Sequence, residues 1–149
     1  PAVGAALAEW RQAYPGCGVL AFLPESEVAF IPDLQMIARR AEVPIVGAVF
    51  PELIVDGVFR PAGVLLLRMD VMPAYALVDG LGAGAEGELA AVEALVGLAD
   101  RSQQPQADAL FMIFDSLVGN IGTLVGQVYA EVGDLVHYGG VNCGSGSGE

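Results

Sequence analysis

The sequence contains no lysine, and its six basic residues are all arginines, set against 18 aspartates and glutamates. The formal net charge is therefore −12. The arginines are scattered along the chain, at Arg11, Arg39, Arg40, Arg60, Arg68 and Arg101. Binding to a nucleic-acid backbone needs a concentrated basic face, and anionic lipid surfaces repel an acidic protein. We therefore expect neither nucleic acid nor a membrane as a partner.

Cysteine and histidine are also scarce. The two cysteines, Cys17 and Cys143, do not establish a disulfide framework in 149 residues, and no export signal is visible at the start of the chain. We therefore expect free thiols and a cytoplasmic location. The single histidine, His137, and two distant cysteines do not supply a zinc-type ligand set, so no metal site is predicted. Asp134, His137 and Cys143 are the residue types of a Cys-His-Asp catalytic arrangement, but an isolated histidine in a strand is more often structural. No catalytic residue, enzyme activity or cofactor is predicted.

No apolar run is long enough to cross a membrane, although 54% of the residues are hydrophobic. The longest uncharged run, residues 116–130, contains Asn120 and Gln127, and a bilayer span needs about 20 mostly apolar residues. The hydrophobic residues therefore belong to a buried sheet and its covering helices. The length fits one domain over residues 1–149. Because the chain begins with Pro1 and ends in a glycine-rich stretch, we expect a fragment truncated at both ends.

The first half of the chain alternates helix and strand signals. Helix formers and helical spacing predict helices, and short apolar runs predict strands; the helices are expected over residues 5–14 and 33–41, and the strands over residues 17–23 and 44–49. Asp33 is expected to N-cap the second helix. Gly47 lies inside the second strand, where a glycine often marks the close approach of another backbone or of a ligand.

Further strands are expected before the next helix. Asp56-Gly57 is a hairpin signal between apolar pairs. Residues 61–69 and 73–78 each read as a strand, and the short linker between them indicates an antiparallel pair. The predicted fold class is therefore α/β, with a mixed, largely parallel sheet flanked by helices, βαβ units and one antiparallel hairpin.

A glycine-rich stretch precedes the helix predicted over residues 88–101. Residues 82–87 show the G-x-G-x-x-G spacing of a dinucleotide-binding loop, between a predicted strand and a helix. Glu86 and Glu88 would repel a pyrophosphate at the start of this helix. A flexible linker is the favoured interpretation, and a nucleotide-binding oxidoreductase-type domain remains an alternative.

Residues 107–149 form the segment around which the chain is organised. A near-continuous apolar strand over residues 108–114 fits a parallel sheet covered on both faces, and a helix (121–132), a second strand (135–138) and a glycine-rich loop follow. This order predicts a βαβ unit. Open α/β sheets bind ligands at the carboxyl ends of their strands. The polar residues expected in those connections are Asp115, Ser116, Asn120, Asn142 and Ser145.

These segments carry a resemblance to a known family. The residues concerned are PIVGAVFPELIVDG followed by VLLLRM, and then DALFMIFDSLVGNIGTLVGQVY with VHYGGVNCGSG. Together they resemble the N-terminal FIST domain, a sensor module of bacterial signalling proteins and some eukaryotic F-box proteins. The similarity runs from about Gly18 to the end of the chain. It implies a cytoplasmic α/β domain for signal transduction that senses small ligands such as amino acids, followed by a C-terminal FIST partner domain in the full-length protein.

The resemblance, together with the strand-end argument, gives a predicted ligand site. Its residues are Gly47, Glu52, Asp115, Ser116, Gly139, Gly140 and Asn142. Glycines would let main-chain N–H groups reach a carboxylate, while Asp115 or Glu52 could hold an ammonium group, as a zwitterionic ligand requires. A scaffold that only mediates interaction or oligomerisation is the second alternative, and it predicts no response to small ligands.

Overall fold

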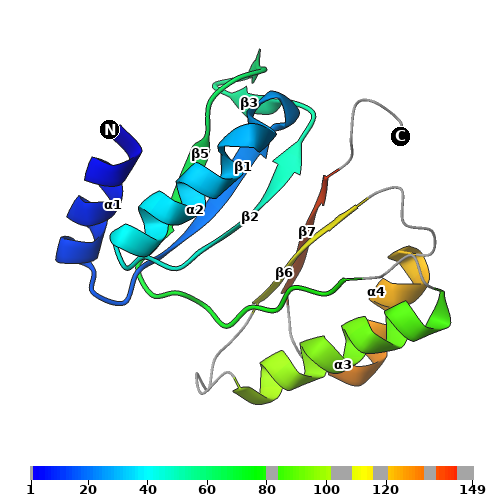
Figure 1. The fold of residues 1–149 in the computed structure, drawn as a ribbon. Coiled ribbons are helices and arrows are strands. Elements are labelled where there is room, and N and C mark those ends of the chain that lie inside the picture. Colours follow the sequence, from blue (N-terminus) through cyan, green and yellow to red (C-terminus); the bar gives the residue numbers. More distant parts are fainter. Residues whose placement is uncertain (1, 80–83, 102–108, 116–120, 133–136, 144–149) are drawn as a thin grey trace. The chain divides into compact units, whose positions relative to one another are not determined.

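The computed structural model describes residues 2–79, 84–101, 109–115, 121–132 and 137–143 (Figure 1). The chain divides into two compact units, which we describe separately: unit 1 comprises Pro1–Pro73 and Cys143–Glu149, and unit 2 comprises Ala74–Asn142. Helices and strands alternate, with parallel and antiparallel strand pairs, which confirms the predicted α/β class. The single domain over residues 1–149 stays a prediction.

The centre of unit 1 is a three-stranded sheet in the order β2-β1-β5. The central strand β1 (Gly18–Pro24) is buried at nearly every position, as its continuous apolar sequence predicts. It pairs in parallel with β2 (Ile45–Phe50) and antiparallel with β5 (Leu65–Met69). The connection from β1 to β2 contains η1 (Glu25–Phe30) and α2 (Ile31–Arg40), which provide the crossover that a parallel pair requires.

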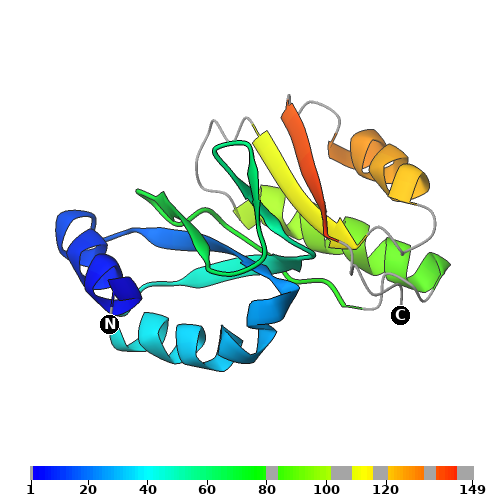
Figure 2. The same ribbon diagram turned by 90° about the horizontal axis from the view of Figure 1, so that it is seen from above.

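Two helices supply the core on one face of this sheet. Alternate residues of β1, Val19, Ala21 and Leu23, are buried against α1 (Ala2–Ala13) and α2. Leu7 of α1 is fully buried beside Val19. Figure 2 shows α2 running along the sheet. Every second residue of β1 therefore faces the apolar sides of α1 and α2, as expected when amphipathic helices pack on a sheet.

The hairpin predicted at Asp56-Gly57 is confirmed. Strands β3 (Leu53–Val55) and β4 (Val58–Arg60) pair antiparallel around these two residues. Asp56 has φ 53° and Gly57 has φ 75°, the left-handed pair that a type I′ turn requires.

The strand predicted over residues 73–78 is wrong, because this described segment has no strand structure. The predicted partner of residues 73–78, β5, pairs antiparallel with β1 on the edge opposite β2. In this pairing Gly18 lies opposite Met69, and Phe22 lies opposite Leu65. The chain then returns beside Gly16, whose carbonyl accepts a hydrogen bond of 2.9 Å from the Met72 N–H. Residues 73–78 pair with no strand among the described residues. Leu77, within this apolar run, is 87% exposed.

The predicted N-cap of α2 is also wrong. The helix begins at Ile31, and the residue in the cap position is Phe30, which makes no side-chain cap hydrogen bond. Phe30 has helical angles, φ −83° and ψ −12°, because η1 runs directly into α2. No extended residue therefore separates the two. Asp33 lies in the first turn, where its carboxylate still complements the helix dipole.

Unit 2 contains the predicted βαβ order. Strands β6 (Ala109–Asp115) and β7 (His137–Cys143) form a two-stranded sheet, and α4 (Ile121–Val132) lies between them in the sequence. The two arrows run in the same direction in Figures 1 and 2. The core lies where α3 (Ala85–Arg101) packs against α4; its buried residues are Ala91, Val92, Leu124 and Val128.

The glycine-rich loop predicted after residue 138 is wrong in its first part. Gly139, Gly140, Asn142 and Cys143 belong to β7, which continues to Cys143. Glycine is unfavourable in an isolated strand, but the backbone of β6 supplies hydrogen-bond partners that local sequence patterns do not reveal. Asn142 therefore lies in a strand and not in a connection.

None of the helices in the described ranges combines the length and apolar character needed to cross a membrane.

Candidate functional site

Two of the predicted ligand-binding residues lie in unit 1. Gly47 is inside β2, opposite Ala21 of β1. A Cβ atom at Gly47 would lie 1.9 Å from the Ala21 carbonyl oxygen, so the close approach predicted at this glycine is that of a neighbouring backbone. Glu52 is exposed and lies between β2 and β3. Because a strand rises about 3.3 Å per residue, Gly47 is about 10 Å from Phe50, the end of β2 that precedes Glu52.

The other predicted residues belong to unit 2 or lie outside the described residues. Asp115 is the last residue of β6, and Asn142 is next to last in β7, so the parallel pairing brings both backbones to the carboxyl edge of this sheet. Gly139 and Gly140 lie further back in β7. Ser116, Asn120 and Ser145 lie outside the described residues. Since each unit is described by itself, a joint site of Gly47 and Glu52 with Asp115 and Asn142 stays a prediction.

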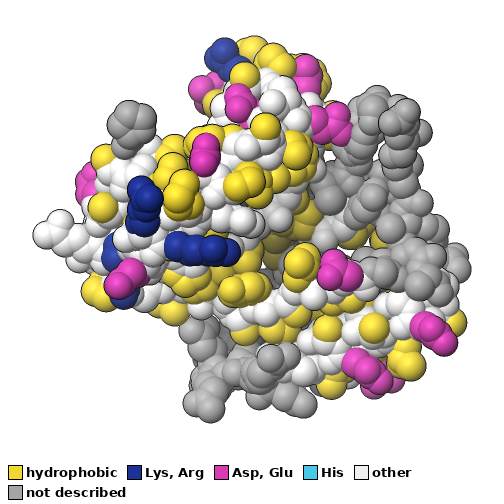
Figure 3. All heavy atoms as spheres, in the orientation of Figure 1, with side chains coloured by type: hydrophobic (Ala, Val, Ile, Leu, Met, Phe, Trp, Pro, Cys, Tyr) yellow, Lys and Arg dark blue, Asp and Glu magenta, His cyan; other side chains and the backbone are white. Residues whose placement is uncertain are grey.

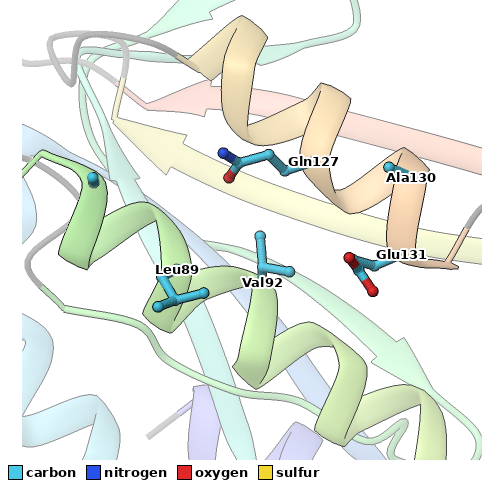
Figure 4. Close-up of a pocket in the computed structure, with 6 residues that line it drawn as sticks. Leu89, Val92, Gln127, Ala130 and Glu131 are labelled. Atoms are coloured by element: carbon cyan, nitrogen blue, oxygen red, sulfur yellow. The ribbon is translucent and has the colours of Figure 1, made fainter.

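An open pocket of about 410 Å³ lies between α3 and α4 of unit 2 (Figure 4). Each helix provides three of the lining residues described: Ala85, Leu89 and Val92 from α3, and Gln127, Ala130 and Glu131 from α4. The sequence prediction included none of them. This volume falls within the range of about 300–1,000 Å³ that is typical of small-molecule sites.

Helical spacing explains why these residues share the pocket. Ala85, Leu89 and Val92 stand at positions i, i+4 and i+7 of α3 and so form one stripe. Gln127 and Glu131 stand four residues apart on α4, with Ala130 beside them. The helices are closely packed where Val92 meets Leu124 and Val128. Val92 also lines the pocket, and Ala85 and Ala130 have the shortest side chains among its described lining residues.

The pocket combines an apolar wall with two polar groups. Leu89 is 57% exposed and offers hydrocarbon surface to a ligand, whereas Val92 is buried and adds little accessible surface. Gln127 and Glu131 are exposed side chains on α4, and Figure 4 shows them beside the space between the helices. The Gln127 amide can donate and accept hydrogen bonds, whereas the Glu131 carboxylate only accepts them. Among the described lining residues, Glu131 is the one charged group.

Charge is distributed unequally between the two units. By sequence, unit 2 contains nine acidic residues and a single arginine, Arg101, whereas the other five arginines belong to unit 1. Figure 3 shows arginine side chains of unit 1 on one face of the molecule. Glu86 and Glu88 add two carboxylates to the first turn of α3, next to Ala85. Together with Glu131 in the lining, these carboxylates favour a cation over an anion at the pocket.

The described residues do not support a catalytic pair of the Cys143 thiol and His137. His137 and Cys143 stand six positions apart in β7, which separates their backbones by about 20 Å. That distance is far beyond the reach of a nucleophile–base hydrogen bond. Cys17 is a buried free thiol in the core under α1. In the part of the chain searched, no group of three His, Cys, Asp or Glu side chains could hold a metal ion.

No protein-family model, curated protein or solved structure matches this chain. The resemblance to the N-terminal FIST domain therefore stays a prediction from the sequence.

Proposed function

We propose that this chain is a small-ligand-binding sensory domain of an intracellular signal-transduction protein. The observation that carries the proposal is the pocket of about 410 Å³ between α3 and α4. Its apolar residues, Leu89 and Val92, and its two polar groups on α4, Gln127 and Glu131, are the usual composition of a small-molecule site. The resemblance to the FIST N-terminal domain supports a role in sensing, with a C-terminal partner domain that transmits the signal.

The chemistry of the pocket favours binding over catalysis. General acid–base catalysis requires a titratable group placed against a reacting atom, and nucleophilic catalysis requires a nucleophile with a base beside it. Of the lining residues described, Glu131 has the one acidic or basic side chain, and neither a thiol nor a hydroxyl group accompanies it. We therefore propose a non-enzymatic domain.

Two features of the structure count against the alternative of a nucleotide-binding domain. A dinucleotide-binding loop joins a strand to a helix, but residues 73–79 contain no strand. The helix α3 begins with Glu86 and Glu88 in its first turn, and these carboxylates would repel a pyrophosphate at that position.

Ligand-induced thermal stabilisation tests the proposed function. The chain is screened against amino acids, amines, organic acids and nucleotides, and a ligand present at 100 times its Kd is expected to stabilise it by about 2.7 kcal/mol, which raises Tm by several degrees. Ala130→Trp fills the pocket and should abolish the shift. Ala90→Trp introduces the same side chain at an exposed position of α3 outside the pocket lining, and should retain it.

Two results contradict this function. One is that no compound raises Tm. The other is that Ala130→Trp and Ala90→Trp respond to the ligand as the unmodified chain does, since binding would then occur elsewhere.

A further inference from the structure

We infer that the pocket between α3 and α4 binds a small aliphatic amine that lacks a carboxylate group, and not a zwitterionic amino acid. This inference rests on the proposed function and specifies the class of ligand for the same site. It follows from the two polar groups that line the pocket, Gln127 and Glu131, and from the two carboxylates, Glu86 and Glu88, in the first turn of α3.

Glu131 and Gln127 form the part of the pocket that would hold the amine. They stand at positions i and i+4 of α4, and residues with this spacing are neighbours on a helix surface, with about 6 Å between their Cβ atoms. A protonated amine has three N–H donors and no acceptor. The Glu131 carboxylate and the Gln127 side-chain carbonyl can each accept one of these hydrogen bonds, and the bond to Glu131 is strengthened by charge.

The opposite wall suits an alkyl chain. Leu89 and Val92 of α3 face this space from across the pocket. Contact with them removes hydrocarbon from water, which is favourable by about 0.8 kcal/mol for each buried CH₂ group. A pocket of about 410 Å³ has room for a branched chain of several carbons in addition to the ammonium group.

For a ligand carboxylate the described lining offers one neutral side-chain donor, the Gln127 amide, and no positive charge. The described lining contains no arginine, histidine or hydroxyl group. Backbone N–H groups also lie at the start of α3, beside Ala85, but one of them is already hydrogen-bonded and two carboxylates belong to the same turn. The Glu88 N–H donates to the Gly84 carbonyl at 3.1 Å, and the carboxylates of Glu86 and Glu88 repel an anion at this turn. An amino acid would therefore bring a negative charge next to Glu131, Glu86 and Glu88, with no counter-charge among the described lining residues.

A ligand series with one constant alkyl group tests this inference. 3-Methylbutylamine, leucine, 3-methylbutanoic acid and 3-methylbutanol share the same branched chain and differ in their polar groups. Binding to the chain is measured by isothermal titration calorimetry at low salt. We expect the amine to bind at least tenfold more tightly than leucine, and the acid to bind more weakly than the alcohol.

Two substitutions connect the preference to the pocket. Glu131→Gln should weaken amine binding by about tenfold, because it removes a charge-assisted hydrogen bond. Glu93→Gln makes the same change at an exposed position of α3 outside the pocket lining and should leave affinity unchanged. Leucine binding as tightly as the amine, or equal effects of the two substitutions, would overturn the inference.

The inference and the proposed function can fail separately. If none of the four compounds binds, but another ligand does and Ala130→Trp abolishes its binding, the proposed function stands and the ligand class is wrong. If Ala130→Trp has no effect on any ligand that binds, the pocket is not the binding site, and both the inference and the proposed function are contradicted.

Discussion

At the residue scale, Gly47 shows how one absent side chain determines strand packing. The carbonyl oxygen of Ala21 lies where a Cβ atom at this position would be, 1.9 Å away. A backbone atom within a paired sheet cannot rotate away as a flexible side chain can. The sequence indicated a close approach at Gly47, but only the structure identifies the neighbour as β1 and not a ligand.

Gly47→Ala is therefore expected to destabilise unit 1 by about 2–4 kcal/mol, because β1 and β2 must move apart to admit the methyl group. Urea unfolding followed by the fluorescence of Trp10, the single tryptophan and a residue packed on the core under α1, measures the change.

The matched control is Gly4→Ala in α1, where the new Cβ atom would make an ordinary contact of 3.5 Å with Ile37. Since alanine is the better helix former, this variant should be neutral or more stable by up to about 1 kcal/mol. Equal stability of the two variants would contradict the proposed role of Gly47.

At the scale of elements, local patterns predicted well those features that local interactions determine. The helix predicted over residues 121–132 is confirmed as α4, and Leu124 and Val128, four residues apart, are its buried positions. The turn at Asp56-Gly57 was predicted because few residue pairs adopt two consecutive positive φ angles. Strand pairing was predicted poorly, because residues 73–78 lack a partner, whereas β7 gains one in β6 and extends through two glycines.

The hairpin turn gives a prediction at this scale. Gly57 has φ 75°, and a Cβ atom there would meet nothing within 4 Å. Gly57→Ala should therefore lower the unfolding free energy of unit 1 by about 1 kcal/mol through backbone strain alone.

Asp56→Asn provides the control for Gly57→Ala, since asparagine also favours the first position of a type I′ turn, and its unfolding free energy should stay within about 0.5 kcal/mol of the unmodified chain. Urea unfolding monitored by Trp10 fluorescence distinguishes the two variants. The turn geometry is refuted as the cause if Gly57→Ala unfolds at the same urea concentration as Asp56→Asn.

At the scale of the whole molecule, the candidate pocket depends on how two helices meet. None of its described lining residues was among the site residues predicted from the sequence. The signals were present, since Gln127 is a polar residue within the uncharged run 116–130 and Ala85 and Ala130 are small, but no local pattern shows that these positions line one pocket. The strand-end argument directed attention to Asp115 and Asn142, whose backbones do share one edge of the β6-β7 sheet.

The net charge differs between the two units, and this difference bears on the expected ligand. The net charge of −12 suggested only that anionic partners are disfavoured. With nine acidic residues and one arginine, unit 2 accounts for most of that charge. Glu131 lines the pocket and Glu86 and Glu88 belong to the first turn of α3 beside Ala85, so a positively charged ligand is expected.

Amide chemical-shift mapping tests the central claim most directly. The chain, labelled with ¹⁵N, is titrated with the ligand that binds most tightly in the calorimetric series. The claim predicts that the largest shifts cluster on the pocket residues, Ala85, Leu89, Val92, Gln127, Ala130 and Glu131, and that they disappear in Ala130→Trp. Shifts concentrated at Gly47 and Glu52, or at the ends of β6 and β7 without changes along α3 and α4, would contradict it.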